Sequence, residues 1–365
     1  MRKYTIGIIG AGMIAEKHIQ AFQKTGRAEI TWVARKDKSR LNGFASRYGI
    51  PRGTDDYREL LADPELEAVV ITSPPYLHRD MFIDALRAGK HVLLEKPAAT
   101  NRKQLHEMLE ARHRFPHLKV LDCSCRHARL QPKFRFVKEY IRSGQLGEVY
   151  FIHHNGVFRN GRPGIEYHPA AKWFLNKELA GGGPMIDWGV YDLSFHLGLL
   201  NDEPELKKVH HAFVTSGLDK KDPGTPVYNV EEHGMALLEF DNGLRYYWER
   251  AAHANVEAPH ETRIYGTKGG LKFAFCSWDS PLITFFDSEN DGTGNARRVD
   301  TEVDMSSHID DDYALAEHFI GLLDGKEDPL MPIERAAKHL EIIFKVYEAA
   351  GGKTPLKQVS EEVTV

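Results

Sequence analysis

The chain has 365 residues, of which 42% are hydrophobic, and its 48 Lys and Arg against 52 Asp and Glu give a net charge of -4. This length is typical of two domains at roughly 150 residues each, and the absence of excess positive charge argues against a nucleic-acid partner. No apolar run reaches the roughly 18 residues that a membrane span needs. We therefore expect a cytoplasmic protein with no membrane partner.

The three cysteines, Cys123, Cys125 and Cys276, are too few for a disulfide framework and fit a reducing compartment. The Cys123-Ser124-Cys125 unit is too short for a zinc site and lacks a second pair of ligands. Its period of two predicts two side chains on one face of a strand. We expect three buried thiols and no metal.

Short apolar strands alternate with helical patterns in the first third of the chain. The expected strands are 4–9, 28–34, 67–72, 91–94 and 118–123, and the expected helices are 13–24, 76–88, 101–114 and a polar helix ending near Tyr48. This alternation predicts a doubly wound, mostly parallel sheet of the Rossmann type. The first domain is expected to span residues 1–125.

A different pattern begins after residue 125. A helix at 132–143, a strand at 148–154, two glycine-rich stretches and a helix at 185–199 precede a series of strand-like segments at 207–215, 231–240, 244–252, 261–265 and 271–275. No helical pattern interrupts this series, which predicts a large, mainly antiparallel open sheet in an α+β domain of residues 126–365. Helices at 310–323 and 332–350 end the chain, and they can pack back on the first domain.

A glycine-rich turn joins the first strand to the first helix. Gly10-Ala-Gly12-Met-Ile-Ala15 has the spacing G-x-G-x-x-A, which permits a tight turn, a close approach to a pyrophosphate and tight packing of helix on strand. The alternative is a tight turn without a ligand. The residues of this turn expected to bind a dinucleotide are Gly10, Gly12, Met13, Ile14 and Ala15.

The end of the second strand bears on which dinucleotide binds. An acidic residue there would bind the ribose 2'-hydroxyl, but this chain has Arg35 followed by Lys36. A guanidinium can pair with a 2'-phosphate. The sequence therefore favours NADP(H), with NAD(H) possible, and the alternative is a solvated pair of charges.

Five motifs in chain order resemble the Gfo/Idh/MocA oxidoreductase family. They are the glycine turn, Ser73-Pro74-Pro75-Tyr76-Leu77-His78, Glu95-Lys96-Pro97, the segment from Gly181-Gly182-Gly183-Pro184 to Asp187-Trp-Gly189-Val-Tyr191, and Ile264-Tyr265-Gly266-Thr267-Lys268-Gly269-Gly270. The resemblance implies a Rossmann domain that binds a nicotinamide cofactor and a second domain whose open sheet builds a dimer or tetramer. It also implies hydride transfer at a secondary alcohol or ketone of a sugar, sugar derivative or cyclitol.

The resemblance assigns roles to individual residues. It implies cofactor contacts from Ser73, Pro74, His78, Glu95 and Lys96, with Lys96 at the nicotinamide. It maps the family's catalytic Asp to Asp187. Tyr191 stands where many members carry His, which resembles the glucose-fructose oxidoreductase branch. Ser73-Pro74-Pro75 stands where the family often has Thr-Pro-Asn, which puts a cofactor contact in doubt. Arg35 replaces the frequent acidic residue, which puts NAD in doubt.

Alcohol oxidation needs a base for the hydroxyl proton, and the reverse reaction needs the same group as an acid. Asp187 and Tyr191 stand four apart, so we expect them on one helix face, with Tyr191 as acid/base, Lys96 polarising the reacting oxygen and Asp187 orienting. A nearby lysine cation is expected to favour the ionised phenol. The alternatives are a solvated strand end for Lys96 and a core phenol for Tyr191. Asp192 and His196 are a second polar pair, either orienting or on the helix surface.

The segment from Arg159 to Trp173 is rich in donors and aromatic residues, which suits a carbohydrate. We expect substrate contacts from Arg162, His168 and Trp173, and the alternative is a long surface loop. Two other functions stay open at this point. One is an NAD-dependent, redox-assisted glycosidase, and the other is a cofactor-sensing protein without catalysis.

Overall fold

The computed structural model describes residues 2–159, 171–219, 224–290 and 292–351. Its first sheet has six parallel strands in the order β3-β2-β1-β4-β5-β6, which confirms the doubly wound topology. The strands are β1 (Tyr4–Ile9), β2 (Ala28–Ala34), β3 (Arg52–Thr54), β4 (Ala68–Ile71), β5 (His91–Leu94) and β6 (Val120–Asp122).

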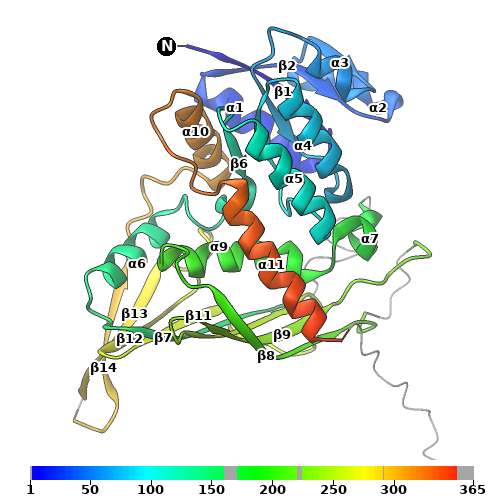
Figure 1. Cartoon of the computed structure of the whole chain (residues 1–365). Coiled ribbons are helices and arrows are strands. Elements are labelled where there is room, and N and C mark those ends of the chain that lie inside the picture. The colour runs from blue at the N-terminus through cyan, green and yellow to red at the C-terminus, as the bar shows by residue number, and fades with distance from the viewer. Residues whose placement is uncertain (1, 160–170, 220–223, 291, 352–365) are drawn as a thin grey trace, which may run out of the picture.

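Helices cover both faces of this parallel sheet (Figure 1). They are α1 (Met13–Thr25), α2 (Lys38–Tyr48), α3 (Tyr57–Leu61), α4 (His78–Arg87) and α5 (Arg102–Arg114), with a 3-10 turn η1 (Pro75–Leu77). Successive strand residues point to opposite faces, so Ile8 and Val70 pack with α1, while Ile9 and Ile71 pack with α4 and α5. Each face thus has its own apolar core.

The second sheet has eight strands in the order β14-β13-β12-β11-β7-β10-β9-β8. Its neighbours are antiparallel except β7 and β10, which confirms a mainly antiparallel sheet. The strands are β7 (Val149–Val157), β8 (Leu206–Thr215), β9 (His233–Phe240), β10 (Arg245–Ala251), β11 (Glu261–Gly266), β12 (Gly269–Phe273), β13 (Leu282–Asn290) and β14 (Ala296–Glu302).

Sequence patterns missed β13 and β14. The edge strand β14 is exposed along almost its whole length and carries charged side chains, so no alternation of apolar and polar residues marks it. A second error concerns Cys123 and Cys125. They lie in a 3-10 turn, η2 (Cys123–Cys125), because Asp122 accepts a hydrogen bond from the Ser124 amide at 2.8 Å and ends the strand. The three thiols are buried, as expected.

Helices lie on one side of the second sheet (Figure 1). The helical segments of this part are α6 (Pro132–Arg142), η3 (Lys172–Leu175), α7 (Lys177–Ala180), α8 (Pro184–Asp187), α9 (Gly189–Leu199), α10 (Asp311–Leu323) and α11 (Ile333–Ala349). The helix expected at 185–199 is divided at Trp188 into α8 and α9. The hydrophobic core runs without interruption from one face of the parallel sheet through α11 and α9 to the second sheet.

Helix α10 returns to the first domain. It packs on α1, where the rings of Phe22 and Phe319 meet edge to face at 6.2 Å, and it shares the core of that side of the parallel sheet. Helices α10 and α11 thus both contact the first expected domain, α10 at α1 and α11 at α5. The boundary between the two domains at residue 125 stays a prediction.

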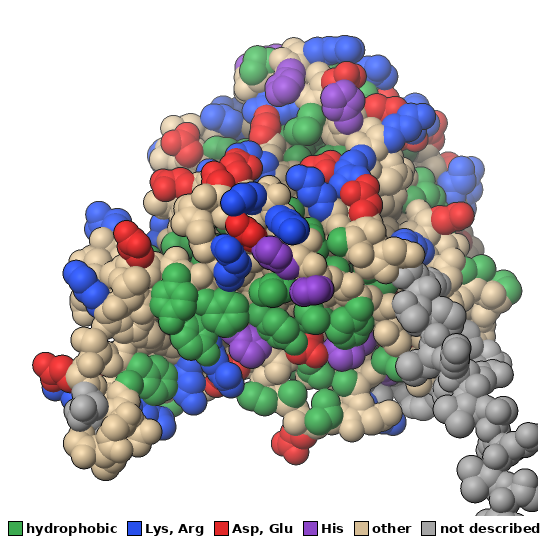
Figure 2. All heavy atoms as spheres, turned by 60° about the horizontal axis from the view of Figure 1, so that its bottom comes forward, with side chains coloured by type: hydrophobic (Ala, Val, Ile, Leu, Met, Phe, Trp, Pro, Cys, Tyr) green, Lys and Arg blue, Asp and Glu red, His purple; other side chains and the backbone are tan. Residues whose placement is uncertain are grey.

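The other face of the second sheet carries no helix in the described part of the chain. Figure 2 brings this side forward and shows hydrophobic and histidine side chains gathered across its middle. Aromatic contacts cross the strands there, including Phe151 with Tyr265 and His153 with Tyr247. None of the described helices combines the length and apolar character needed to cross a membrane.

Candidate active site

The glycine turn fits a pyrophosphate. Gly10 has a φ of 102°, and a Cβ there would lie 2.7 Å from the Ser73 backbone nitrogen, so only glycine is tolerated. Gly12 caps α1 without any side-chain hydrogen bond, and a Cβ on it would meet nothing within 4 Å. The space beside Gly12 at the start of α1 is thus open, with Met13 exposed and Ala15 buried.

Arg35 lies beside this turn. Its backbone amide bonds to Thr54, and one guanidinium nitrogen donates to the carbonyl of Ala11 within the glycine turn. Lys36 is exposed beside it. The structure therefore puts a guanidinium at the end of β2 against the glycine turn, at the position where an acidic residue would bind a ribose hydroxyl.

Lys96, Asp187 and Tyr191 come together between the two domains. The Lys96 Nζ lies 2.6 Å from Asp187 Oδ1 and 2.7 Å from the Asp187 carbonyl oxygen, and 4.9 Å from the centre of the Tyr191 ring. Lys96 follows β5, so it stands at the carboxyl edge of the parallel sheet, where such sheets bind ligands. The sequence predicted this grouping, including the shared side of Asp187 and Tyr191.

A buried arginine that the sequence did not single out completes the group. Arg126 donates from Nη2 to the Tyr191 hydroxyl at 2.8 Å and from Nη1 to Glu95 Oε1 at 2.5 Å. Glu95 also pairs with His18 of α1 at 2.7 Å. Burial acts to raise the pKa of Glu95, but Arg126 and His18 outweigh it and hold that pKa well below its usual range.

The ionisation of Tyr191 differs from the expectation. Burial raises the pKa of its phenol well above the usual range, and the lowering by the Arg126 guanidinium does not offset it. The expected bias towards the ionised phenol is therefore wrong for the protein without ligands. The Lys96 cation lies over the ring rather than at the oxygen. Tyr191 is held as a neutral phenol.

A second residue that the sequence did not single out, Glu231, positions Asp187. Its carboxylate accepts hydrogen bonds from the amides of Gly183 at 2.7 Å and Met185 at 3.1 Å, at the start of the short helix that ends with Asp187. A Cβ on Gly183 would lie 1.9 Å from the Glu231 carbonyl oxygen. This close approach explains the glycine at this position. The hydroxyl of Tyr347, in α11, donates a hydrogen bond to the Glu231 carboxylate at 2.8 Å.

Aromatic rings line the side of Tyr191 that faces the second domain. The His127 ring lies 4.9 Å from the Tyr191 ring, 5.0 Å from Trp278 and 6.1 Å from Trp188. Trp278 is 59% exposed although it contacts this buried group. A large exposed ring beside polar groups is typical of carbohydrate recognition.

Two residues expected to touch the cofactor are buried and bonded within the protein. His78 is fully buried, with Nε2 2.8 Å from the Ser73 carbonyl and Nδ1 3.0 Å from the Pro97 carbonyl, so it holds two loops together. Glu95 is buried between His18 and Arg126. Both side chains hold neighbouring loops in place, and direct cofactor contacts from them stay a prediction. Ser73 is buried and Pro74 is half-buried beside the glycine turn.

The predicted substrate residues fall largely outside the described part of the chain. Arg162 and His168 are not among the described residues. Trp173 lies in η3 with its ring stacked on Phe174 at 3.8 Å. Substrate contact by these three residues stays a prediction.

Asp192 and His196 are neither on the helix surface nor bonded to each other. Asp192 accepts from Arg250 and Trp248, and His196 lies 2.8 Å from the Tyr246 hydroxyl and 2.9 Å from the Thr262 hydroxyl. Both are fully buried against the second sheet. They join α9 to that sheet, so of the two alternatives for this pair the helix surface is excluded.

Three groups of described residues bring possible metal ligands within 4.8 Å of one another: His18, Glu95 and Cys123; His260, Cys276 and Asp279; and Asp219, Glu232 and His253. In the first, Glu95 already pairs with the Arg126 cation. In the other two, the Asp279 and Glu232 carboxylates already accept backbone amides. These bonds explain the carboxylates without an ion.

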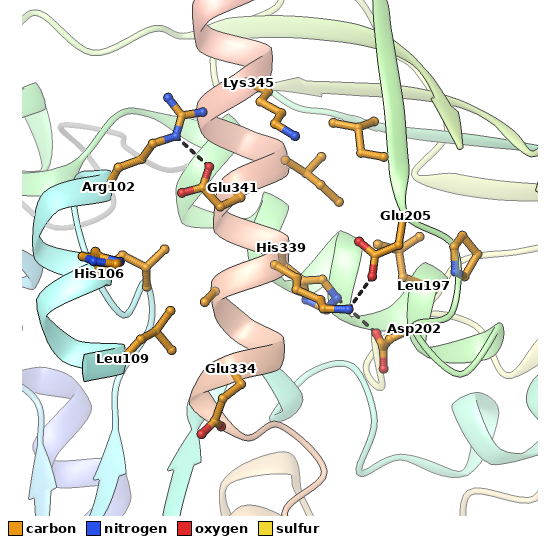
Figure 3. Close-up of a pocket in the computed structure, with 16 residues that line it drawn as sticks. Arg102, His106, Leu109, Leu197, Asp202, Glu205, Glu334, His339, Glu341 and Lys345 are labelled. Atoms are coloured by element: carbon orange, nitrogen blue, oxygen red, sulfur yellow. Dashed lines mark hydrogen bonds and ion pairs between the residues drawn. The ribbon is translucent and has the colours of Figure 1, made fainter. Parts of the chain in front are cut away.

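A separate hollow of about 350 Å³ lies over α11, between α5 and the start of β8 (Figure 3). Some of its charged side chains are paired with one another. Figure 3 shows Arg102 beside Glu341 and His339 beside Asp202. Arg102 Nε lies 2.6 Å from Glu341 Oε2, and His339 Nε2 lies 3.1 Å from Asp202 Oδ1. This hollow is distinct from the Lys96 group.

A glycine turn for a dinucleotide and a lysine, carboxylate and phenol at the same edge of the sheet define a nicotinamide-dependent oxidoreductase. The family profile for the NAD-binding Rossmann domain of the Gfo/Idh/MocA oxidoreductases matches residues 4–115, and the profile for a C-terminal domain of that family matches residues 134–272. The chain belongs to the Gfo/Idh/MocA oxidoreductase family.

Relatives of known sequence and structure extend this result. An uncharacterised oxidoreductase of Rhizobium meliloti is 32% identical over 73% of this chain and 72% of its own. D-glucoside 3-dehydrogenase of Escherichia coli is 28% identical over 94% of this chain and 95% of its own. The crystal structure of aldose-aldose oxidoreductase from Caulobacter crescentus superposes with a TM-score of 0.77 at 24% identity, covering 96% of this chain and 98% of that one.

Proposed function

We propose that this oxidoreductase transfers hydride between NADP(H) and a secondary alcohol or ketone of a sugar, a sugar derivative or a cyclitol. The observation that carries the proposal is the contact of Lys96, Asp187 and Tyr191 at the carboxyl edge of the parallel sheet. The glucoside and aldose activities named for two relatives support the substrate class. The exposed Trp278 ring beside the group suits the C–H face of a sugar ring.

Each side chain has a role in this proposal. A bound nicotinamide supplies the hydride donor or acceptor. Tyr191 gives its proton to the substrate oxygen during reduction and takes it back during oxidation. Lys96 donates a hydrogen bond to the same oxygen and so polarises it, while Asp187 holds the lysine in place at 2.6 Å. Gly10, Gly12 and the first amides of α1, from Met13 to Ala15, hold the pyrophosphate.

Arg35 supports NADP over NAD, with Lys36 adding positive charge. The test is calorimetric titration of NAD and NADP into the wild type and Arg35→Asp. Tighter binding of NADP, reversed in the variant, is the expected result. Equal or tighter binding of NAD by the wild type would overturn the preference for NADP. A screen of sugars, ketosugars and cyclitols under the preferred cofactor then tests the substrate class, and failure of every substrate would contradict it.

A second candidate is a redox-assisted glycosidase, in which the cofactor is retained through the cycle. Net reduction of added cofactor separates the two, because a dehydrogenase shows it and the glycosidase does not. The dehydrogenase is favoured because Arg35 stands where an NAD-specific site would carry an acid. A non-catalytic sensor is disfavoured by the joint presence of Lys96, Asp187 and Tyr191.

We also infer a homodimer or homotetramer that covers the open face of the second sheet. The cross-strand aromatic contacts on that face are apolar surface that association would bury. Sedimentation with and without Tyr247→Glu, on this face, tests it, and a monomeric wild type would contradict it. The three free thiols suit the reducing cytoplasm.

A further inference from the structure

The Tyr191 hydroxyl accepts a hydrogen bond but donates none to a described residue. Arg126 donates to the Tyr191 oxygen at 2.8 Å, and an arginine offers only donors, so the phenol is the acceptor in this bond. The phenol's own proton must then point to some other acceptor. No described residue accepts it, although Tyr191 is only 1% exposed. A buried hydroxyl with an unused donor is costly unless a bound group receives it.

We propose that Arg126 is a positioning residue that aims the Tyr191 proton at the substrate oxygen and holds the phenolate formed when that proton leaves. The inference rests on the proposed function. In the reducing direction the carbonyl carbon receives the hydride with its electron pair, which a bound reduced nicotinamide would supply on becoming oxidised. As the carbonyl π bond opens, the oxygen takes the proton from Tyr191, whose O–H bond breaks. The alcohol is the product, and the negative charge is left on the phenolate oxygen, 2.8 Å from a guanidinium.

The charges around the phenol set the strength of this effect. Arg126 and His127 approach it from the turn after β6, Glu95 and Lys96 from the end of β5, and Asp187 from α8. Glu95 opposes the phenolate but also holds the Arg126 guanidinium in place. Arg126 is 3% exposed, so solvent screens its charge little. Removing Arg126 therefore makes the phenolate harder to form.

The pKa of the phenol tests this directly and needs no substrate. A fluorinated tyrosine, which is more acidic than tyrosine, is placed at position 191 and titrated by fluorine NMR in the full chain. We expect its pKa to rise by about 1–3 pH units in Arg126→Met, as for loss of an opposite charge at this distance, and by less in Arg126→Lys. An unchanged pKa in Arg126→Met would overturn the proposal.

The chain provides a matched control three residues further on. Arg129 is a second buried arginine that contacts α9, through the Ser194 carbonyl at 2.8 Å, but its ion pair is with Asp202. Arg129→Met should lower stability without moving the pKa of the phenol at 191. Because Arg126→Met leaves Glu95 without its arginine, the double variant Arg126→Met/Glu95→Gln provides a folded comparison. An equal rise in the pKa of the phenol at 191 in Arg126→Met and Arg129→Met would indicate a structural effect and overturn the proposal.

Turnover provides the second readout. Arg126→Met should slow the chemical step about 10²-fold, as for loss of one donor to a developing oxyanion, and should cost little more when Tyr191 is already Phe. Guanidinium ion added to an Arg126→Gly variant should restore part of the rate. Fully additive losses would contradict action through Tyr191. If no carbohydrate is turned over, the proposed function fails, while the titration at position 191 still decides the role of Arg126.

Discussion

Tyr191 and Asp192 are neighbours on α9, and both are buried and bound to a buried arginine, yet they belong to different parts of the molecule. Tyr191 contacts Lys96 and Arg126, which follow β5 and β6, while Asp192 contacts the second sheet. The Asp192 oxygens accept Arg250 Nε at 2.6 Å and Trp248 Nε1 at 2.8 Å, with His154 3.3 Å away. Burial and an ionic partner therefore do not distinguish a reactive residue from a structural one.

Unused hydrogen-bonding capacity does distinguish them. The Asp192 carboxylate accepts hydrogen bonds from Arg250 and Trp248 of β10 and has His154 of β7 beside it, whereas the Tyr191 hydroxyl has a proton that no described residue accepts. Successive helix residues point about 100° apart because a turn contains 3.6 residues, so one helix serves both sides. Helix α9 thus carries Tyr191, the proposed proton donor, on one side and a buried ion pair with the second sheet on the other.

The largest expected effect is the loss of activity in Tyr191→Phe. Removing the phenol oxygen removes the proton donor, so kcat should fall by about 10²–10⁴-fold, while the free energy of unfolding changes by only about 1 kcal/mol. Stopped-flow absorbance of the nicotinamide and urea denaturation measure the two effects. Retained turnover would remove Tyr191 from the chemistry and leave it a core phenol.

Asp192→Asn should show the reverse pattern. Breaking a buried pair leaves Arg250 uncompensated, so we expect the free energy of unfolding to fall by about 3–5 kcal/mol. Burial acts to raise the pKa of Asp192, but Arg250 and His154 outweigh it and hold that pKa well below its usual range. The pair's contribution is therefore fully present above about pH 4 and is lost as the pH falls through the native pKa. Denaturation at pH 7 and at lower pH checks this, and equal stability at pH 7 would contradict it.

Asp122 extends the comparison to a buried carboxyl that has no cationic partner. Burial raises its pKa to about 6, and its Oδ2 has no hydrogen-bond partner in the described part of the chain. A raised carboxyl pKa favours the folded state below the unfolded value near pH 4, and this contribution is lost as the pH rises through 6. Asp122→Asn keeps the acceptor for Ser124 and should raise stability at pH 8 by about 2 kcal/mol, with little change at pH 4.

The matched measurement is urea denaturation of both proteins at pH 4, 6 and 8. Asp122→Asn should flatten the pH dependence between 4 and 6. A variant that is less stable than the wild type at pH 8 would show that the Asp122 carboxylate has a partner when ionised.

The parts of the site that follow local rules were accessible from the sequence. The strand, turn and helix around Gly10 are set by residues next to one another, and Lys96 and Asp187 lie at ends of elements that the hydrophobic pattern marks. Arg126 and Glu231 were missed because each acts through a contact with a distant segment, with Tyr191 and with Gly183. The available signal was a charged side chain shortly after the carboxyl end of a parallel strand, since Arg126 follows β6 after one short turn and Lys96 follows β5.

The roles assigned to Glu95 and His78 show the limit of such rules. Both stand at strand or loop ends where a cofactor contact is expected. The sequence does not indicate that His18 and Arg126 cover Glu95. Nor does it indicate that two backbone carbonyls bind the ring of His78. The same holds for Asp192, whose partners come from β7 and β10. Burial at such positions depends on tertiary contacts, which a pattern along one chain segment does not contain.

The smallest expected effect concerns two tryptophans, one near Tyr191 and the other bonded to Asp192. Trp278 is 59% exposed beside His127, whereas Trp248 is fully buried and bonded to Asp192. If Trp278 stacks on the substrate, Trp278→Ala loses about 1 kcal/mol of binding, so KM rises about fivefold while kcat and stability stay the same. Trp248→Phe, the control, should lower stability and leave KM unchanged in the folded fraction. An unchanged KM in Trp278→Ala would mean that the substrate ring binds elsewhere, and the segment ending at Trp173 would then be the first place to test.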